Sequence, residues 1–145
     1  MFTRLCVLFC CCVLLGCGSS KLYDVRAVVS LDGKPLTEAV VLLLPVRENA
    51  ASAFGITDTE GQVILKTGEQ DGVFPGAYIV VVSKLIEEKQ LSNNEIRALA
   101  EIGIQYNPGV VELVPSRYSR RETSELRAKI GYWHSKNMTF NLWSE

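Results

Sequence analysis

Hydrophobic and polar residues follow one another along the chain in a pattern that predicts β-strands. Residues 23–31 place apolar side chains at every second position, which is the period of a half-buried strand. Residues 39–44 are apolar without interruption, and we expect them to form a central strand with both faces covered. The seven expected strands span residues 23–31, 39–44, 53–57, 62–67, 77–82, 126–130 and 138–142.

Turn-forming residues separate these strands. Gly33 and Gly76 lie where tight turns need a residue that tolerates positive φ. Residues 58–61 are expected to form a four-residue hairpin loop between two of the strands. Tyr78 enters a strand directly after a turn, so we expect its ring to pack in the core and its hydroxyl to bond back to a loop.

One helix interrupts the strand pattern. Ser92 and Glu95 have the spacing of a capping box, in which each residue bonds the backbone N–H of the other. A narrow apolar stripe follows, and Gly103 is a natural C-terminal stop, which predicts a helix of about ten residues. We expect this helix to rest on the edge of the domain.

Short strands with turns between them indicate an all-β fold. The pattern predicts a seven-stranded antiparallel β-sandwich of immunoglobulin or transthyretin type, with one short helix inserted before the last two strands. A parallel α/β sheet would need a helix between most strands, and only one helix is expected.

The first residues have the features of a targeting segment. Arg4 supplies a positive charge, and residues 5–15 form an apolar run of eleven residues. A membrane-spanning helix needs about 18 to 20 such residues, so the run has the length expected of a signal peptide. We assign residues 1–16 to the signal peptide.

The end of this run resembles the lipobox of bacterial lipoproteins. Leu14-Leu15-Gly16-Cys17 places a small residue before a cysteine, and polar residues follow. The resemblance implies cleavage between Gly16 and Cys17 and a thioether-linked diacylglycerol on Cys17, which would be the membrane anchor of the protein. No aspartate follows Cys17, which in this family favours the outer membrane, with the domain in the periplasm or at the cell surface. The alternative is an ordinary secretory signal cleaved elsewhere.

Composition excludes several classes of function. The chain has 145 residues, of which 48% are hydrophobic and 21% are charged, values typical of one folded domain. Its net charge of −1 gives no basic footprint for nucleic acid. All five cysteines lie in the first seventeen residues, and His134 is the only histidine. The sequence therefore predicts no cysteine-based enzyme, no disulfide framework and no cofactor.

Several motifs together resemble small bacterial lipoproteins with a carboxypeptidase-regulatory-like domain. They occur in family order and cover nearly the whole chain after the signal peptide: residues 28–36 (VVSLDGKPL), 55–61 (GITDTEG), 71–78 (DGVFPGAY), 115–119 (PSRYS) and 140–142 (FNL). The resemblance implies an accessory β-sandwich without a zinc site and without enzymatic activity. It also implies that residues 85–114 are a variable insertion.

Some acidic residues and the single histidine raise the question of a metal site. Asp58, Glu60 and Asp71 supply the oxygen ligands that calcium prefers, but they lack the alternating spacing of dedicated calcium loops, so a turn is favoured. His134 has no second histidine or cysteine to complete a metal site and is expected at the surface.

The aromatic residues near the C-terminus form the one site-like feature. Tyr132, Trp133 and Trp143 are candidate ligand contacts, because exposed aromatic rings mark interfaces and can stack on sugars. The alternative is that Trp133 caps the end of the sandwich while Trp143 packs near the last strand.

The sequence thus predicts a lipidated N-terminus and tether over residues 17–22 and a β-sandwich over residues 23–145. We expect a non-enzymatic module of the cell envelope that binds another protein through a sheet edge or the 85–114 insertion. Carbohydrate binding through Tyr132, Trp133 and Trp143 is the alternative function.

Overall fold

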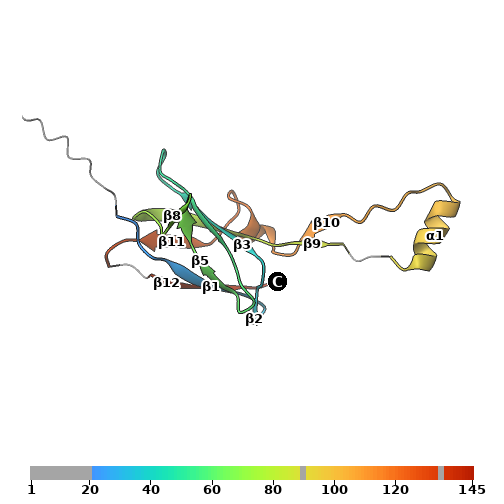
Figure 1. The fold of residues 1–145 in the computed structure, drawn as a ribbon, viewed down its shortest axis with the longest axis horizontal. Coiled ribbons are helices and arrows are strands. Elements are labelled where there is room, and N and C mark those ends of the chain that lie inside the picture. Colours follow the sequence, from blue (N-terminus) through green and yellow to red (C-terminus); the bar gives the residue numbers. More distant parts are fainter. Residues whose placement is uncertain (1–20, 89–90, 134–135) are drawn as a thin grey trace, which may run out of the picture.

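Two β-sheets make up the body of the molecule in the computed structural model, which describes residues 21–88, 91–133 and 136–145 (Figure 1). The first sheet contains β1 (Arg26–Leu31), β2 (Lys34–Pro35), β5 (Gln62–Ile64) and β12 (Asn137–Leu142). The second has the order β11-β8-β3-β4-β6-β7, with β3 (Val40–Pro45), β4 (Ala53–Ile56), β6 (Lys66–Thr67), β7 (Gln70–Asp71), β8 (Gly76–Ser83) and β11 (Arg127–Ile130). The expected all-β character with largely antiparallel pairing is confirmed.

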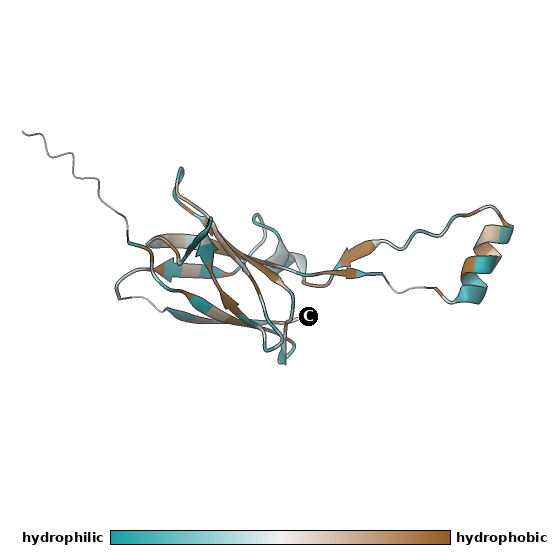
Figure 2. Cartoon of the chain, in the orientation of Figure 1, coloured by the Kyte–Doolittle hydropathy of each residue, from teal (hydrophilic) through white to brown (hydrophobic). Residues whose placement is uncertain are grey.

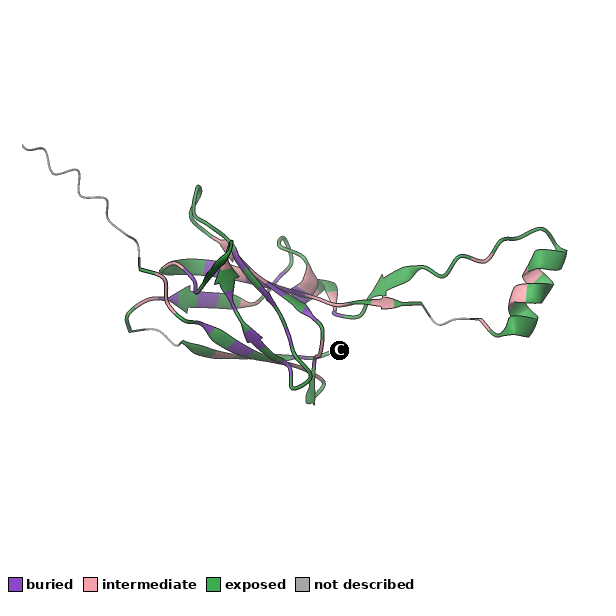
Figure 3. Ribbon diagram, in the orientation of Figure 1, coloured by how far each residue is buried: buried purple, intermediate pink, exposed green. Residues whose placement is uncertain are grey.

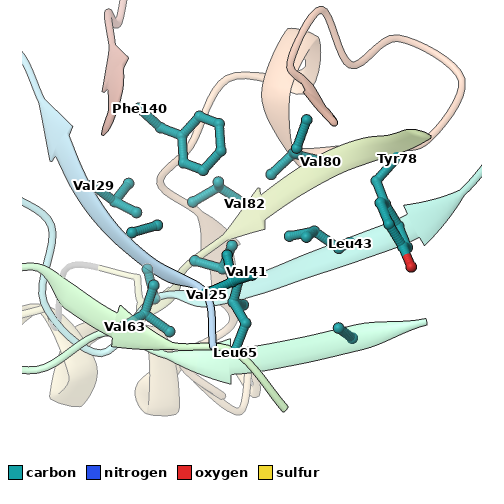
Figure 4. Packing of buried hydrophobic residues seen from close by; sticks show 14 of the residues in the cluster. Val25, Val29, Val41, Leu43, Val63, Leu65, Tyr78, Val80, Val82 and Phe140 are labelled. Atoms are coloured by element: carbon teal, nitrogen blue, oxygen red, sulfur yellow. The ribbon is translucent and has the colours of Figure 1, made fainter. Parts of the chain in front are cut away.

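The core lies between the two sheets. Val29 and Phe140 from the first sheet face Val41, Leu43 and Val82 from the second (Figure 4). These side chains occupy alternate positions on their strands, and each contributes about 1.5–3 kcal/mol when it is fully buried. The alternation predicted for residues 23–31 is confirmed at Val25, Ala27 and Val29, which are all buried.

The expectation for residues 39–44 is only half correct. As expected, β3 is a central strand, because it pairs with β4 on one side and β8 on the other. One face, with Val41 and Leu43, is fully buried, but Val40 on the other face is 37% exposed. The interpretation that both faces are covered is therefore only partly right: on the outer face Leu42 and Leu44 are partly buried, and burial alternates along the strand (Figure 3).

The described residues form twelve strands where the sequence predicts seven. Residues 62–67 divide at the buried Leu65 into β5 and β6, which belong to different sheets. The short strands β2 and β7, and the pair β9 (Leu85–Glu87) and β10 (Val110–Glu112), are the other additions. Strands of two or three residues are too short to show a period in the sequence.

The loop at residues 58–61 forms the expected turn, but the two expected strands pair only at their far ends, where Phe54 of β4 lies opposite Lys66 of β6. Asp58 N–H donates to the Gln62 carbonyl at 2.8 Å, and Gly61 N–H donates to the Asp58 carbonyl at 3.1 Å. After the turn the chain crosses to the other sheet, where β5 pairs with β1. Gly61 has a φ of 75°, and a Cβ there would lie 2.5 Å from the Val29 carbonyl oxygen, so glycine is required on both counts.

One strand pair departs from the antiparallel arrangement. β1 and β12 run parallel, with Val29 opposite Phe140 and Leu31 opposite Leu142. Hydrophobic alternation is the same in parallel and antiparallel strands, so the sequence pattern does not indicate direction. No short turn links these strands, because nearly the whole described chain lies between them.

The largest difference from expectation is the insertion. Residues 85–113, which we call the arm, leave the body as the two-stranded ribbon β9–β10 and extend to the helix α1 (Asn93–Glu101) at its far end (Figure 1). The helix is in the expected place, but none of its residues is buried, so the expectation that it rests on the domain edge is wrong. Val114, the last residue of the predicted insertion, belongs to the core.

A second helix, α2 (Ser116–Ser119), was not expected from the sequence. It is a single turn of four residues that begins after Pro115. Tyr118 on this turn is buried and packs in the core.

Candidate functional site

The apolar face of α1 is the most unusual surface of the described chain. Leu91, Glu95, Ala98, Leu99 and Ile102 line one shallow hollow of about 350 Å³. Counted from Glu95, the other three residues of α1 and its C-cap lie three (Ala98), four (Leu99) and seven (Ile102) positions later. This spacing places all four side chains on one face of the helix. Among the described residues, no side chain of the body covers this face. An exposed apolar patch of this kind marks an interaction site.

Hydrophobic residues are exposed along the whole arm, both on α1 and beyond it. Ile102 is 71% exposed and Ile104 is 51% exposed, while Leu85 and Val110 on the ribbon are 63% and 65% exposed. Figure 2 shows the hydrophobic colour of both ribbon strands. A short element that leaves this much apolar surface in water is stabilised when a partner covers it.

Local hydrogen bonds define the start of α1. The Ser92 hydroxyl accepts from Glu95 N–H, and the Glu95 carboxylate accepts from Ser92 N–H at 2.8 Å, so the predicted capping box is confirmed. The Ser92 side chain and backbone hold the pKa of Glu95 below its ordinary value. Gly103, with a φ of 77°, ends the helix as expected.

The base of the arm is fixed to the body by hydrogen bonds. Glu112 accepts from Ser83 Oγ at 2.5 Å, from Lys84 N–H at 2.8 Å and from Val114 N–H at 3.0 Å. Lys84 Nζ donates to the Thr37 carbonyl at 2.6 Å. These bonds tie both legs of the ribbon to the body and so define the direction in which the arm leaves it. This role of Lys84 and Glu112 could not be predicted from the sequence, because no local spacing relates the two residues.

The arm is acidic as well as apolar. It contains five glutamates against one lysine and one arginine, a net charge of −3 for residues 85–113. The body contributes no charged side chain beside α1 among the described residues. A protein partner with an apolar groove and a basic rim would match this surface.

The structure divides the three candidate aromatic residues between two places. Tyr132 and Trp133 lie in edge-to-face contact in the loop before β12, with ring centroids 4.8 Å apart and an interplanar angle of 84°. They are 75% and 88% exposed. Trp143 follows the other end of the six-residue strand β12, so it does not join them in one platform.

The C-terminal residues around Trp143 are held by two side chains. Arg117 donates to the carbonyls of Trp143 and Glu145, each at 2.6 Å, and the Asp32 carboxylate accepts from Ser144 N–H at 2.9 Å. The bond from Ser144 and the charge of Arg117 lower the pKa of Asp32. Arg117 therefore fixes the backbone after β12, while the Trp143 side chain is 55% exposed.

The acidic residues considered for calcium are engaged elsewhere. Asp58 accepts from the backbone N–H groups of Glu60 and Gln62, at 2.9 and 2.8 Å, as in a turn. Asp71 forms an ion pair with Lys66 at 3.1 Å. Among the described residues no three histidine, cysteine or carboxylate side chains gather as metal ligands.

The expected signal peptide (residues 1–16, with Gly16 at the cleavage site), the expected lipidation site Cys17 and His134 lie outside the described part of the chain. No helix in the described residues is long and apolar enough to span a membrane. Comparison with known proteins finds no matching family, no similar curated protein and no similar solved structure.

Proposed function

We propose that this chain is a lipid-anchored module of the bacterial cell envelope that binds a partner protein through its arm and catalyses no reaction. Its body is a β-sandwich of the carboxypeptidase-regulatory-like type, and Cys17 is its site of lipidation. The observation that supports partner binding most directly is the exposed apolar face of α1, which stands apart from the body.

The partner class follows from the chemistry of the arm. Helices with one apolar face bind into hydrophobic grooves of other proteins through residues one helical turn apart. Leu99 and Ile102 are such residues, and the glutamates around them favour a partner with basic residues beside its groove. The partner is therefore a protein with an apolar groove and a basic rim.

Replacing Ile102 with aspartate tests the arm. Because Ile102 is 71% exposed and contacts no core residue, the fold should be unaffected. Recovery of the partner by crosslinking in intact cells should fall on the order of tenfold, the effect of a central interface residue. Ile56→Asp is the matched control, since Ile56 is 63% exposed on the body. Equal recovery with both variants would contradict binding through the arm.

Intact mass tests the anchor. Protein extracted from the membrane fraction should have the mass of residues 17–145 plus acyl chains, and Cys17→Ala should abolish this species. Thioether attachment requires the cysteine sulfur, and stable anchoring needs about two acyl chains. An unmodified full-length mass in the soluble fraction would show that the anchor does not exist.

Carbohydrate binding is the second candidate function. The exposed edge-to-face pair of Tyr132 and Trp133 favours it, since exposed rings stack on sugars. Trp143 is too far along β12 to join this pair, which reduces the proposed three-ring platform to two rings.

A further inference from the structure

The aromatic pair lies at the end of the body where the described chain begins. Tyr132 and Trp133 share a cleft of about 480 Å³ with the segment that precedes β1; the full lining is Lys21, Leu22, Tyr23, Asp24, Tyr132, Trp133 and Lys136. Figure 1 shows the β11–β12 loop and the start of the described chain at one end of the body, and the arm at the other.

Backbone hydrogen bonds fix this arrangement. Tyr23 and Val73 exchange both of their N–H···O bonds at 2.9 Å, and Arg26 N–H donates to the Lys136 carbonyl at 2.7 Å. These bonds join Tyr23 to the segment between β7 and β8, and they join the start of β1 to the aromatic loop. Lys21 consequently enters the body beside Trp133.

Covalent geometry limits how far this end can lie from the proposed anchor. Four residue steps separate Cys17 from Lys21, and four extended residues span at most about 14 Å. A lipid chain on Cys17 therefore keeps Lys21, which lines the cleft, within about 14 Å of the membrane surface, less than half the thickness of the hydrocarbon core.

We propose that this aromatic end is a membrane-contact site, in which Tyr132 and Trp133 enter the headgroup region of the bilayer that holds the anchor. The inference rests on the proposed lipidation of Cys17 and adds to it an orientation of the domain.

The chemistry of the site matches a bilayer interface. Tryptophan and tyrosine gather at the headgroup level because each has an apolar ring and a polar hydrogen-bonding group. Lys21 and Lys136 are both exposed beside the rings and can reach lipid phosphates with their ammonium groups. The acidic residue in the cleft, Asp24, lies 3.6 Å from the guanidinium of Arg26.

The contact gives the arm a direction. With the aromatic end on the membrane, α1 projects away from that membrane, where a partner in the aqueous space can reach it. A bound sugar at the same two rings would give no such orientation.

The two tryptophans of the chain allow a direct test, because they lie at opposite ends of β12. Trp143→Phe leaves Trp133 as the only tryptophan, and Trp133→Phe leaves Trp143. Both full-length proteins, expressed and lipidated in a bacterium, are reconstituted into vesicles of phosphatidylcholine and phosphatidylglycerol. A fraction of the lipid is brominated in the upper half of its acyl chains, so that it quenches nearby tryptophans.

We expect fluorescence from Trp133 to fall about twofold and to shift to shorter wavelength, while fluorescence from Trp143 stays unchanged. Equal quenching of both residues, or none, in protein that floats with the vesicles would overturn the orientation and leave the anchor intact. A change in Trp133 fluorescence on adding envelope glycans, without quenching by lipid, would assign the pair to sugar binding instead. Failure of the protein to float would overturn the anchor and the orientation together.

Discussion

Tyr78→Ala is expected to lower the free energy of unfolding by about 3–5 kcal/mol, the range measured for removal of large aromatic side chains from cores. Tyr78 is 2% exposed, and its ring lies among the core residues at the edge of the cluster in Figure 4. Its hydroxyl donates to the Phe74 carbonyl at 2.8 Å. The total free energy of unfolding of a small domain is about 5–15 kcal/mol. Much of the Tyr78→Ala protein would therefore unfold at moderate urea concentrations.

Tyr78→Phe is the matched control. It keeps the ring and removes only the hydrogen bond to Phe74, so it should cost about 1 kcal/mol. Urea denaturation followed by circular dichroism measures both changes. A loss of under about 1 kcal/mol for Tyr78→Ala would show that the ring does not pack as the structure places it.

Burial also makes stability depend on alkaline pH. Burial raises the pKa of Tyr78, so at high pH the unfolded chain loses the phenolic proton first. The stability that the neutral Tyr78 phenol contributes is fully present below about pH 10, the pKa of tyrosine in an unfolded chain. It is lost as the pH rises through the higher pKa of Tyr78 in the folded protein. Tyr78→Phe should reduce the alkaline loss of stability relative to the unaltered protein.

Thr57→Val has the second largest expected effect, about 2–4 kcal/mol of destabilisation. The Thr57 hydroxyl donates to the Leu36 carbonyl at 2.6 Å and accepts from Ala39 N–H at 2.8 Å. All three residues are buried. Valine keeps the shape of threonine but leaves these two backbone groups without a partner in a place that water does not reach.

Thr57→Ser separates the hydroxyl from the methyl group. Serine keeps both hydrogen bonds and should lose only about 1 kcal/mol with the methyl group. The same denaturation measurement applies. If Thr57→Val and Thr57→Ser lower the free energy of unfolding equally, the Thr57 hydroxyl does not stabilise the contact between residues 36 and 57.

Much of the local structure could be predicted because its signals lie close together in the sequence. The capping box at Ser92 needs only a spacing of three residues, and the hydroxyl bond of Tyr78 follows from a ring placed just after a turn. Asp32-Gly33 forms the expected turn between β1 and β2, with φ values of 51° and 77° that suit this residue pair.

The relations that could not be predicted are those between distant residues. β1 and β12 meet in parallel although more than a hundred residues separate them, and Glu112 bonds Ser83 and Lys84 across the whole arm. Ile102 could have been found from the sequence, since it follows Leu99 by three residues on the face that includes Leu91. The sequence does not indicate whether the body covers that face of the helix.

The continuity of β8 with β9 has a mechanical consequence. A pull between the tether and the arm would enter the domain at the start of β1 and leave it at the end of β8, and each of these strands has neighbours on both sides. Tension along such strands strains their ladder hydrogen bonds together, in shear, whereas an edge strand pulled from one end peels away bond by bond. Because the load enters through β1 and leaves through β8, the protein would resist being stretched between its two ends. Its lifetime under that load depends on its unfolding rate.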